Sequence, residues 1–240
     1  IINLDTADDP RIAPYRAVRD RDLIRADRFI VEGAIALERL LTASRFPVES
    51  LLLAENRVDA LGPILAHVPP DTPIYVTPQS IMDGVTGFPI HRGILALARR
   101  KPAQTPDQLL ASLPAGPLTL LVLIGLSNHD NVGGCFRNAA ALGAHAVLLD
   151  ETSCDPLYRK AIRVSSGAAL SLPFAHTGSG AETIAHRLMW LRAQEMVLVE
   201  LAVAHFQHVG IVPVAGAGEF FVSGLREPDL GEAVPGVANI

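Results

Sequence analysis

The sequence predicts an α/β fold: a mostly parallel sheet with helices on both faces, preceded by a smaller α/β block. Three observations indicate this fold. Short apolar runs that suit strands alternate with segments of helical apolar spacing. The strand candidates are apolar at nearly every position, which is typical of strands buried on both faces. Of the 240 residues, 49% are hydrophobic, enough for a sizeable core in one large domain or two small ones.

Residues 1–103 are predicted to form the first block. Six arginines fall within a short N-terminal stretch, among three aspartates: Arg11, Arg16, Arg19, Arg21, Arg25 and Arg28, with Asp20, Asp22 and Asp27. Helical spacing of apolar residues predicts a helix across residues 29–44. Apolar runs predict strands at 48–56, 72–78 and 92–100, and a short helix is expected to start at Gln79 and end at Gly84 or Gly87.

Residues 104–118 are rich in proline, alanine and polar residues, which predicts a linker containing a short helix. Residues 119–240 form the second predicted block. Its strands begin at 118–126 and recur at 144–150, 170–175 and 196–204, with helices between them.

Composition excludes several classes of protein. The net charge of −5 gives no bulk signal for nucleic acid, so such binding would need a local basic patch. Only two basic residues are lysines, a bias that suits phosphate recognition and equally fits a GC-rich genome. The two cysteines form no CxxC pair, and we expect no metal site. No apolar run is long enough for a membrane span and no signal peptide opens the chain, so we expect a cytoplasmic location without membrane contact.

The stretch 125–150 predicts a polar turn, a short helix and the next strand. Apolar residues mark one helix face: Val132, Cys135, Phe136, Ala139 and Ala140. Asn131 is placed to cap the first turn, and the glycines at 133–134 suit a site where something approaches the backbone closely. Arg137 lies off the apolar face, near the carboxyl ends of the strands, where ligands bind in open α/β sheets. A solvated arginine on an amphipathic helix explains the same spacing without any function.

The pattern Asn131-x-Gly133-x-x-x-Arg137-Asn138-Ala139 resembles the first signature of the SpoU (TrmH) class of SPOUT RNA 2′-O-ribose methyltransferases. The run 165–168, Ser-Ser-Gly-Ala, followed by Pro173, resembles the second signature. Residues 29–41 and 84–101 are similar to the small RNA-binding domain often fused ahead of the catalytic domain.

The resemblance implies a SPOUT-type fold, a homodimer, and methyl transfer from S-adenosylmethionine to a ribose 2′-hydroxyl of rRNA or tRNA. Arg137 is then the expected catalytic residue, orienting the hydroxyl and stabilising developing alkoxide charge. Asn131 is expected to hold the loop and this arginine in place. The residues that the resemblance assigns to the cofactor are Ser166, Gly167, Leu201 and Ala202.

RNA contacts are expected from basic residues in both blocks. Asp155 and Pro156 are predicted to start a helix on which Arg159 and Arg163 share one face, suited to phosphate. Arg92 and the N-terminal arginines are further candidates. A solvated basic face explains the helical pair without RNA.

The third family signature has no match in the sequence from about residue 197 onwards, where it should follow the strand near residue 200. In the family this segment builds most of the cofactor pocket and threads a trefoil knot, so the knot is in doubt here. The alternative to an active enzyme is therefore a degenerate or truncated relative that binds RNA without catalysis.

Overall fold

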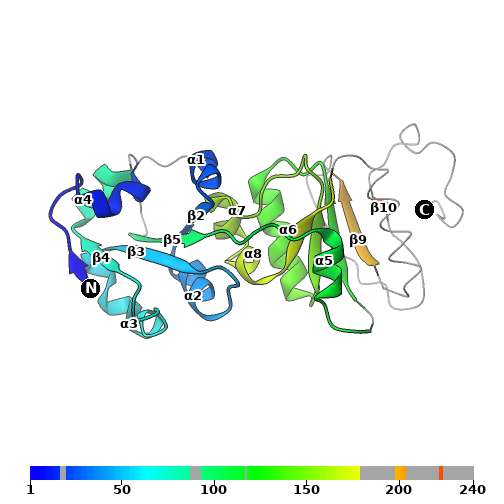
Figure 1. Cartoon of the computed structure of the whole chain (residues 1–240), viewed down its shortest axis with the longest axis horizontal. Coiled ribbons are helices and arrows are strands. Elements are labelled where there is room, and N and C mark those ends of the chain that lie inside the picture. Colours follow the sequence, from blue (N-terminus) through cyan, green and yellow to red (C-terminus); the bar gives the residue numbers. More distant parts are fainter. Residues whose placement is uncertain (17–19, 87–92, 117, 179–197, 204–221, 224–240) are drawn as a thin grey trace, which may run out of the picture. The chain divides into compact units, whose positions relative to one another are not determined.

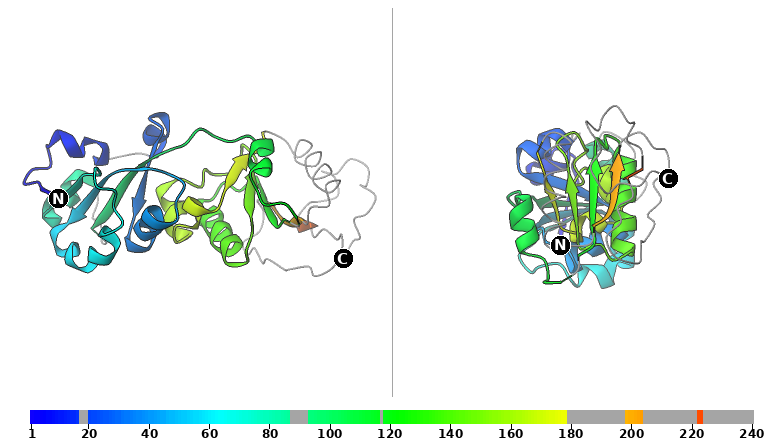
Figure 2. Two further views of the ribbon diagram at one scale, coloured as in Figure 1. Left: turned by 60° about the horizontal axis from the view of Figure 1, so that its bottom comes forward. Right: turned by 90° about the vertical axis from the view of Figure 1, so that its right-hand side faces the viewer.

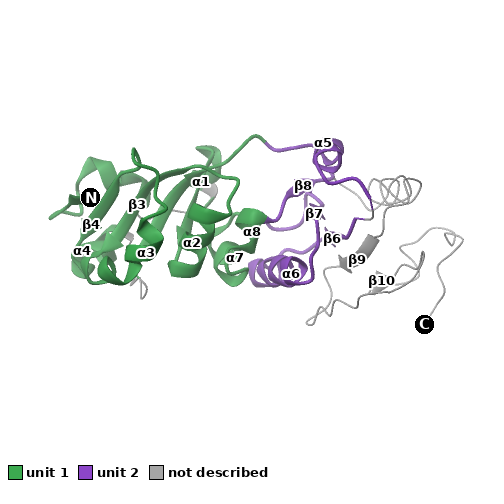
Figure 3. Ribbon diagram, turned by 90° about the horizontal axis from the view of Figure 1, so that it is seen from below, with its two compact units in different colours: residues 1–102, 156–171 green, residues 103–155, 172–240 purple. Residues whose placement is uncertain are grey.

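The computed structural model describes residues 1–16, 20–86, 93–116, 118–178, 198–203 and 222–223. The chain forms two compact units, coloured separately in Figure 3. Unit 1 comprises Ile1–Pro102 with Pro156–Ser171, and unit 2 comprises Ala103–Asp155 with Leu172–Ile240. A segment from the second predicted block, 156–171, therefore packs with the first.

Unit 1 contains a five-stranded mixed sheet with strand order β1-β4-β3-β5-β2 (Figure 1). Its strands are β1 (Ile2–Asn3), β2 (Arg28–Glu32), β3 (Val48–Ala54), β4 (Ile74–Thr77) and β5 (Ile94–Arg99). Strands β1, β4 and β3 are parallel, whereas β5 is antiparallel to β3 and β2. The strands predicted at 48–56, 72–78 and 92–100 are confirmed.

The helices of unit 1 are short. They are η1 (Pro10–Tyr15), α1 (Asp20–Arg25), α2 (Ala34–Thr42), η2 (Glu55–Arg57), η3 (Asp59–Leu61), α3 (Gly62–Leu65), α4 (Gln79–Thr86), α7 (Arg159–Val164) and α8 (Ala168–Ser171). The helix predicted across 29–44 is wrong in its first part, because Phe29, Ile30 and Val31 belong to β2 and pair with β5. Aromatic and β-branched residues favour strands, and Gly33, with a φ of 95°, separates the strand from α2.

Unit 2 contains a five-stranded parallel sheet with strand order β10-β9-β6-β7-β8 (Figure 2). Its strands are β6 (Leu120–Ile124), β7 (Ala146–Leu149), β8 (Phe174–His176), β9 (Leu198–Val203) and β10 (Val222–Ser223), and its helices are α5 (Pro106–Ala111) and α6 (His129–Ala141). All the pairings between neighbouring strands are parallel, which confirms the predicted parallel sheet.

Helices α5 and α6 cover opposite faces of this sheet. Leu109 of α5 belongs to an apolar cluster with Leu148 and Ala175. Phe136 of α6 instead makes an edge-to-face contact with Phe174, with the ring centroids 5.8 Å apart. Neighbouring strand residues point to opposite faces, so the two helices contact opposite sides of β8. The segment predicted to be a linker thus supplies a helix that packs on the sheet.

Helix α5 begins at a capping box. The Thr105 hydroxyl accepts the Gln108 amide proton at 3.2 Å, and the Gln108 side chain accepts the Thr105 amide proton at 3.0 Å. Pro106 occupies the first turn, where its missing N–H costs nothing. These local signals hold a helix of only six residues at the start of unit 2.

Within the described ranges, no helix combines the length and apolar character needed to cross a membrane. Among the same residues, His, Cys, Asp and Glu side chains form no group of three or more that could hold a metal ion. Cys135 and Cys154 are both free thiols, the first buried and the second partly exposed.

Candidate active site

Helix α6 begins three residues earlier than the sequence predicts. Its N-cap is Asn128, whose side-chain oxygen accepts the amide protons of Asp130 at 2.8 Å and Asn131 at 3.4 Å. The predicted cap at Asn131 is therefore wrong, and Asn131 lies in the first turn with its own amide capped. Asn128 takes this place because its backbone is extended, which turns the side chain back over the helix start.

The apolar face of α6 is as predicted. Val132, Cys135, Phe136 and Ala139 are buried, whereas Arg137 is exposed. Arg137 has no hydrogen bond or ion pair with any described residue. The Cα–Cβ bond of a helical residue tilts toward the helix N-terminus, and the N-terminus of α6 follows the loop after β6. An exposed, unengaged guanidinium can meet an anionic or hydroxyl-bearing ligand.

The C-terminus of α6 is closed by a Schellman motif. The amide of Ala144 donates to the Ala139 carbonyl at 2.9 Å, and that of Gly143 donates to Ala140 at 3.3 Å. Gly143 has a φ of 76°, the left-handed conformation that this motif requires. Both ends of the helix that carries Arg137 are thus fixed by local hydrogen bonds.

A buried carboxylate lies beside the loop that precedes α6, and the sequence did not reveal it. Asp150 is 4% exposed and follows β7 directly. Its carboxylate accepts the amide protons of Gly125 at 3.0 Å and Ser153 at 2.9 Å, and it also accepts hydroxyl protons from Ser153 at 2.6 Å and from Thr152. Burial alone would raise the pKa of Asp150, but these hydrogen bonds outweigh it and lower the pKa.

Two further contacts join the loop after β6 to the loop after β7. The Ser153 hydroxyl oxygen accepts the Leu126 amide proton at 3.0 Å, and the Cys154 amide donates to the Leu126 carbonyl at 2.8 Å. The Cys154 thiol donates to the Ser127 carbonyl at 2.6 Å. Burial raises the pKa of this thiol, with a smaller effect from Asp155, so the thiol stays protonated as the donor needs.

The second signature forms the turn between α7 and α8. The Gly167 amide donates to the Ile162 carbonyl at 2.9 Å, and the Ser166 amide donates to Arg163 at 3.1 Å, again a Schellman motif. Ser166 and Gly167 both have left-handed backbones, with φ values of 52° and 79°.

Gly167 is explained by helix packing within unit 1. A Cβ atom added there would lie 2.9 Å from the Arg39 Cβ and 3.3 Å from the Ala36 Cα, both on α2. Its amide is also already bonded within the turn. Gly167 therefore has no room for a side chain in this arrangement, and its contact with the cofactor stays a prediction.

The other predicted cofactor residues lie elsewhere. Leu201 and Ala202 belong to β9, where they pair with Val122 and Leu123 of β6. They lie near the carboxyl end of β9, at the sheet edge that also holds the loop after β6. The residues that follow β9, 204–221, are outside the described part, as is most of the segment in which the third signature was sought.

Arg159 and Arg163 share one face of α7, as predicted, but both approach a carboxylate. Their guanidinium nitrogens lie 3.8 Å and 3.4 Å from an oxygen of Glu32, whose side chain is 9% exposed. The predicted helix start at Asp155 and Pro156 is wrong, because α7 begins at Arg159 with Tyr158 as its N-cap. Leu157, two residues before the helix, is 3% exposed and packs into the core.

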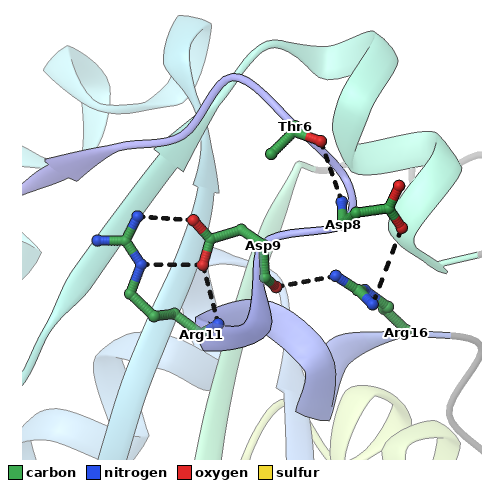
Figure 4. Close-up of polar contacts among 5 residues, drawn as sticks. All are labelled: Thr6, Asp8, Asp9, Arg11 and Arg16. Carbon is green, nitrogen blue, oxygen red and sulfur yellow. Dashed lines mark hydrogen bonds and ion pairs between the residues drawn. The ribbon is translucent and has the colours of Figure 1, made fainter.

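Arg11 and Arg16, two of the N-terminal arginines, are held by local acidic groups (Figure 4), whereas Arg19 and the side chain of Arg21 lie outside the described part. Two guanidinium nitrogens of Arg11 donate to the Asp9 carboxylate, at 2.9 Å and 2.6 Å. These hydrogen bonds lower the pKa of Asp9 to about 2. Arg16 donates to the Asp9 carbonyl at 2.9 Å and lies 3.9 Å from the Asp8 carboxylate. The Asp8 amide donates to the Thr6 hydroxyl at 3.2 Å. These contacts of Arg11 and Arg16 hold the chain in place at the start of η1.

Two other candidate arginines also lie near carboxylates. Arg28 lies 2.8 Å from Glu49, and Arg25 lies 3.9 Å from Asp22. Arg92, predicted to contact RNA, lies outside the described residues. Of the candidate arginines described above, Arg137 is the one whose charge meets no described carboxylate.

Comparisons with known proteins agree on one family. Residues 119–201 match the SpoU rRNA Methylase family. An uncharacterised tRNA/rRNA methyltransferase of Mycobacterium bovis is 39% identical over 173 residues, covering 70% of this chain and 58% of that protein. The 23S rRNA (guanosine-2′-O-)-methyltransferase RlmB of Shewanella oneidensis is 30% identical over 164 residues, covering 65% of each. The chain thus matches less than two thirds of the length of these relatives.

Solved structures share the fold. An S-adenosylmethionine-bound rRNA methyltransferase from Sinorhizobium meliloti superposes with a TM-score of 0.62 at 14% identity, covering 89% of this chain and 92% of that one. The SpoU methyltransferase AviRb from Streptomyces viridochromogenes, also in complex with this cofactor, gives 0.62 at 17% identity, covering 87% and 90%. The expected SPOUT-type fold is thereby confirmed. Residues 119–201 are thus similar to the SpoU class of RNA methyltransferases.

Proposed function

We propose that this protein transfers a methyl group from S-adenosylmethionine to a ribose 2′-hydroxyl of rRNA or tRNA. The observation that carries the proposal is Arg137, exposed on a helix fixed at both ends and without a partner among the described residues. The match of residues 119–201 to the SpoU rRNA Methylase family and the names of the relatives support the reaction type.

Arg137 would act on the attacking oxygen. A ribose hydroxyl is a poor nucleophile and would give up its proton to water as it attacks, so negative charge develops on its oxygen. A guanidinium in hydrogen-bond reach stabilises that charge and orients the hydroxyl. An arginine stays protonated at neutral pH, so positioning and electrostatic stabilisation are its proposed contributions. Asn131, six residues earlier on α6, would hold the loop around the same ligand.

The cofactor would supply an electrophilic methyl group on a sulfonium. Leu201 and Ala202 are the proposed contacts on β9, because the carboxyl edge of a parallel sheet is where ligands bind in α/β folds. Ser166 remains a proposed contact through its hydroxyl, which has no partner among the described residues. Gly167, which packs against α2, stays a proposed contact beside Ser166.

RNA would be bound by basic side chains outside the catalytic loop. We propose Arg159 and Arg163 for phosphate contact, because both guanidiniums lie on one face of α7 beside the same Glu32 carboxylate. Their side chains remain 29% and 42% exposed, enough to meet a phosphate. Arg92 is proposed on its resemblance to the family's RNA-binding domain. The homodimer, the domain boundaries at 103 and 118 and the cytoplasmic location stay predictions.

The test is methyl transfer from radiolabelled S-adenosylmethionine to rRNA and tRNA lacking the modification. Wild type should label RNA at a nucleotide that resists alkaline cleavage, because methylation removes the attacking 2′-hydroxyl. Arg137→Ala should lose this labelling. Its melting temperature should stay unchanged, and its RNA affinity should stay within about threefold of that of wild type. Labelling of a base rather than a ribose, or normal turnover by the variant, would overturn the proposal. RNA binding without cofactor binding in calorimetry would identify the non-catalytic alternative.

A further inference from the structure

The loop that precedes α6 donates hydrogen bonds to side chains of the loop after β7. Residues 125–128 connect the end of β6 to the N-cap of α6. Gly125 donates to the Asp150 carboxylate, and Leu126 donates to the Ser153 hydroxyl. The first two amides of this loop therefore depend on two side chains that lie 25 and 27 residues further along the chain.

Asp150 is bound too tightly to be a solvated surface acid. It is 4% exposed and accepts four hydrogen bonds, two from backbone amides and two from hydroxyls. A buried carboxylate with four donors keeps a fixed position, because moving it would leave several buried donors unpaired. Ser153 bonds to both Asp150 and Leu126, so it passes that fixed position on to the loop.

The geometry points to Asp150 as a positioning residue for Arg137, an inference that rests on the proposed function. Asp150 acts through Ser153 and the loop 125–128, which together set where α6 starts and so where the guanidinium lies. It does not touch the reacting atoms in this scheme. Small displacements of a catalytic group lower turnover strongly, whereas global stability can absorb the loss of one buried network.

Thr177 provides a matched control at the same sheet edge. It is 5% exposed, follows β8 directly, and its hydroxyl donates to the Leu149 carbonyl at 3.2 Å. Like Asp150, it is a buried polar residue just after a strand. Unlike Asp150, it has no hydrogen bond to the loop 125–128 among those found. Thr177→Val should therefore cost stability without moving α6.

The experiment compares Asp150→Asn, Ser153→Ala, Thr177→Val and Arg137→Ala in the methyl-transfer assay, with kcat and the KM for RNA measured separately. Asp150→Asn should lower kcat roughly 10- to 100-fold, with KM changed less than about threefold. Ser153→Ala should change kcat in the same direction, and Thr177→Val should leave it within about threefold of wild type. Amide hydrogen exchange at Gly125 and Leu126 should accelerate in Asp150→Asn and stay unchanged in Thr177→Val.

Each outcome decides one of the two proposals. Normal kcat in Asp150→Asn beside an inactive Arg137→Ala would overturn the positioning role and leave the proposed function standing. Equal losses in Asp150→Asn and Thr177→Val would also overturn it, since any buried polar group would then serve. If Arg137→Ala keeps full turnover, or wild type transfers nothing, the proposed function fails. In that case, unchanged amide exchange at Gly125 and Leu126 in Asp150→Asn would overturn the role of Asp150 in holding the loop.

Discussion

Glu32 and Arg163 are 131 residues apart in sequence, yet a guanidinium nitrogen of one lies 3.4 Å from a carboxylate oxygen of the other. Glu32 ends β2, and Arg163 lies on α7, which packs against that strand. The carboxylate is 9% exposed, and Arg159 approaches the same oxygen at 3.8 Å. A strand of the first predicted block and a helix next to the second signature therefore share one buried charge.

Replacing Glu32 should destabilise unit 1 moderately. Glu32→Gln keeps the shape and removes the charge that faces two arginines. Because those arginines are partly exposed, water compensates for part of the loss, and we expect about 1 kcal/mol less unfolding free energy in urea titrations. Glu38→Gln, at an exposed position on α2, is the matched control and should change little. Equal effects of the two substitutions would contradict a structural role for the Glu32 pairs.

The arginines on α7 should determine part of the salt dependence of RNA binding. If Arg163 contacts a phosphate, Arg163→Gln should reduce the slope of log K against log salt by about 0.7, the value for one single-strand phosphate contact. Arg11→Gln is the control, because Arg11 is engaged by two hydrogen bonds to Asp9. Filter binding at four salt concentrations measures both slopes. A slope unchanged in Arg163→Gln would place RNA on another face.

Replacement by alanine should change stability in opposite directions at two glycines. Gly134 lies inside α6, and a Cβ there would meet nothing within 4 Å, so Gly134→Ala should stabilise by about 1 kcal/mol through helix propensity. Gly167 has a φ of 79°, and a Cβ there would lie 2.9 Å from the Arg39 Cβ. Gly167→Ala should therefore destabilise by roughly 3 kcal/mol, from backbone strain and overlap together. Thermal unfolding of both variants measures the contrast, and a stable Gly167→Ala would mean that α2 yields easily.

The sequence predicts most strands from continuous apolar runs and the solvent-facing side of α6 from the helical spacing of its apolar residues, whereas the residues of β2 were predicted as helix. Arg137 lies on the exposed side as its spacing indicates. Helix starts were harder to predict. The turn before α6 offers two asparagines three residues apart, and the backbone conformation at Asn128 selects the cap.

Long-range polar contacts left no local pattern. An acid followed two and three residues later by hydroxyls occurs widely, so nothing in the sequence singled out Asp150 as the group that holds the loop 125–128. The ion pairs between α7 and Glu32 were hidden for the same reason, since each partner alone resembles a solvated charge. Gly167 was assigned to a cofactor by its signature, whereas the space beside it is filled by α2.

Asp150 should determine part of the acid stability of the protein. The pKa of Asp150 in the folded protein is lowered, since its hydrogen bonds favour the charged form more than burial opposes it. A group with a depressed folded pKa stabilises the protein above its unfolded pKa, about 4 for aspartate, and that contribution is lost as pH falls through the lower folded value. Asp150→Asn has no such titration. Wild type should therefore exceed Asp150→Asn in unfolding free energy at pH 7, and the difference should shrink as the pH falls below about 4. Urea unfolding of both proteins from pH 7 to pH 3 measures this difference, and a constant gap over that range would show that Asp150 acts through shape rather than charge.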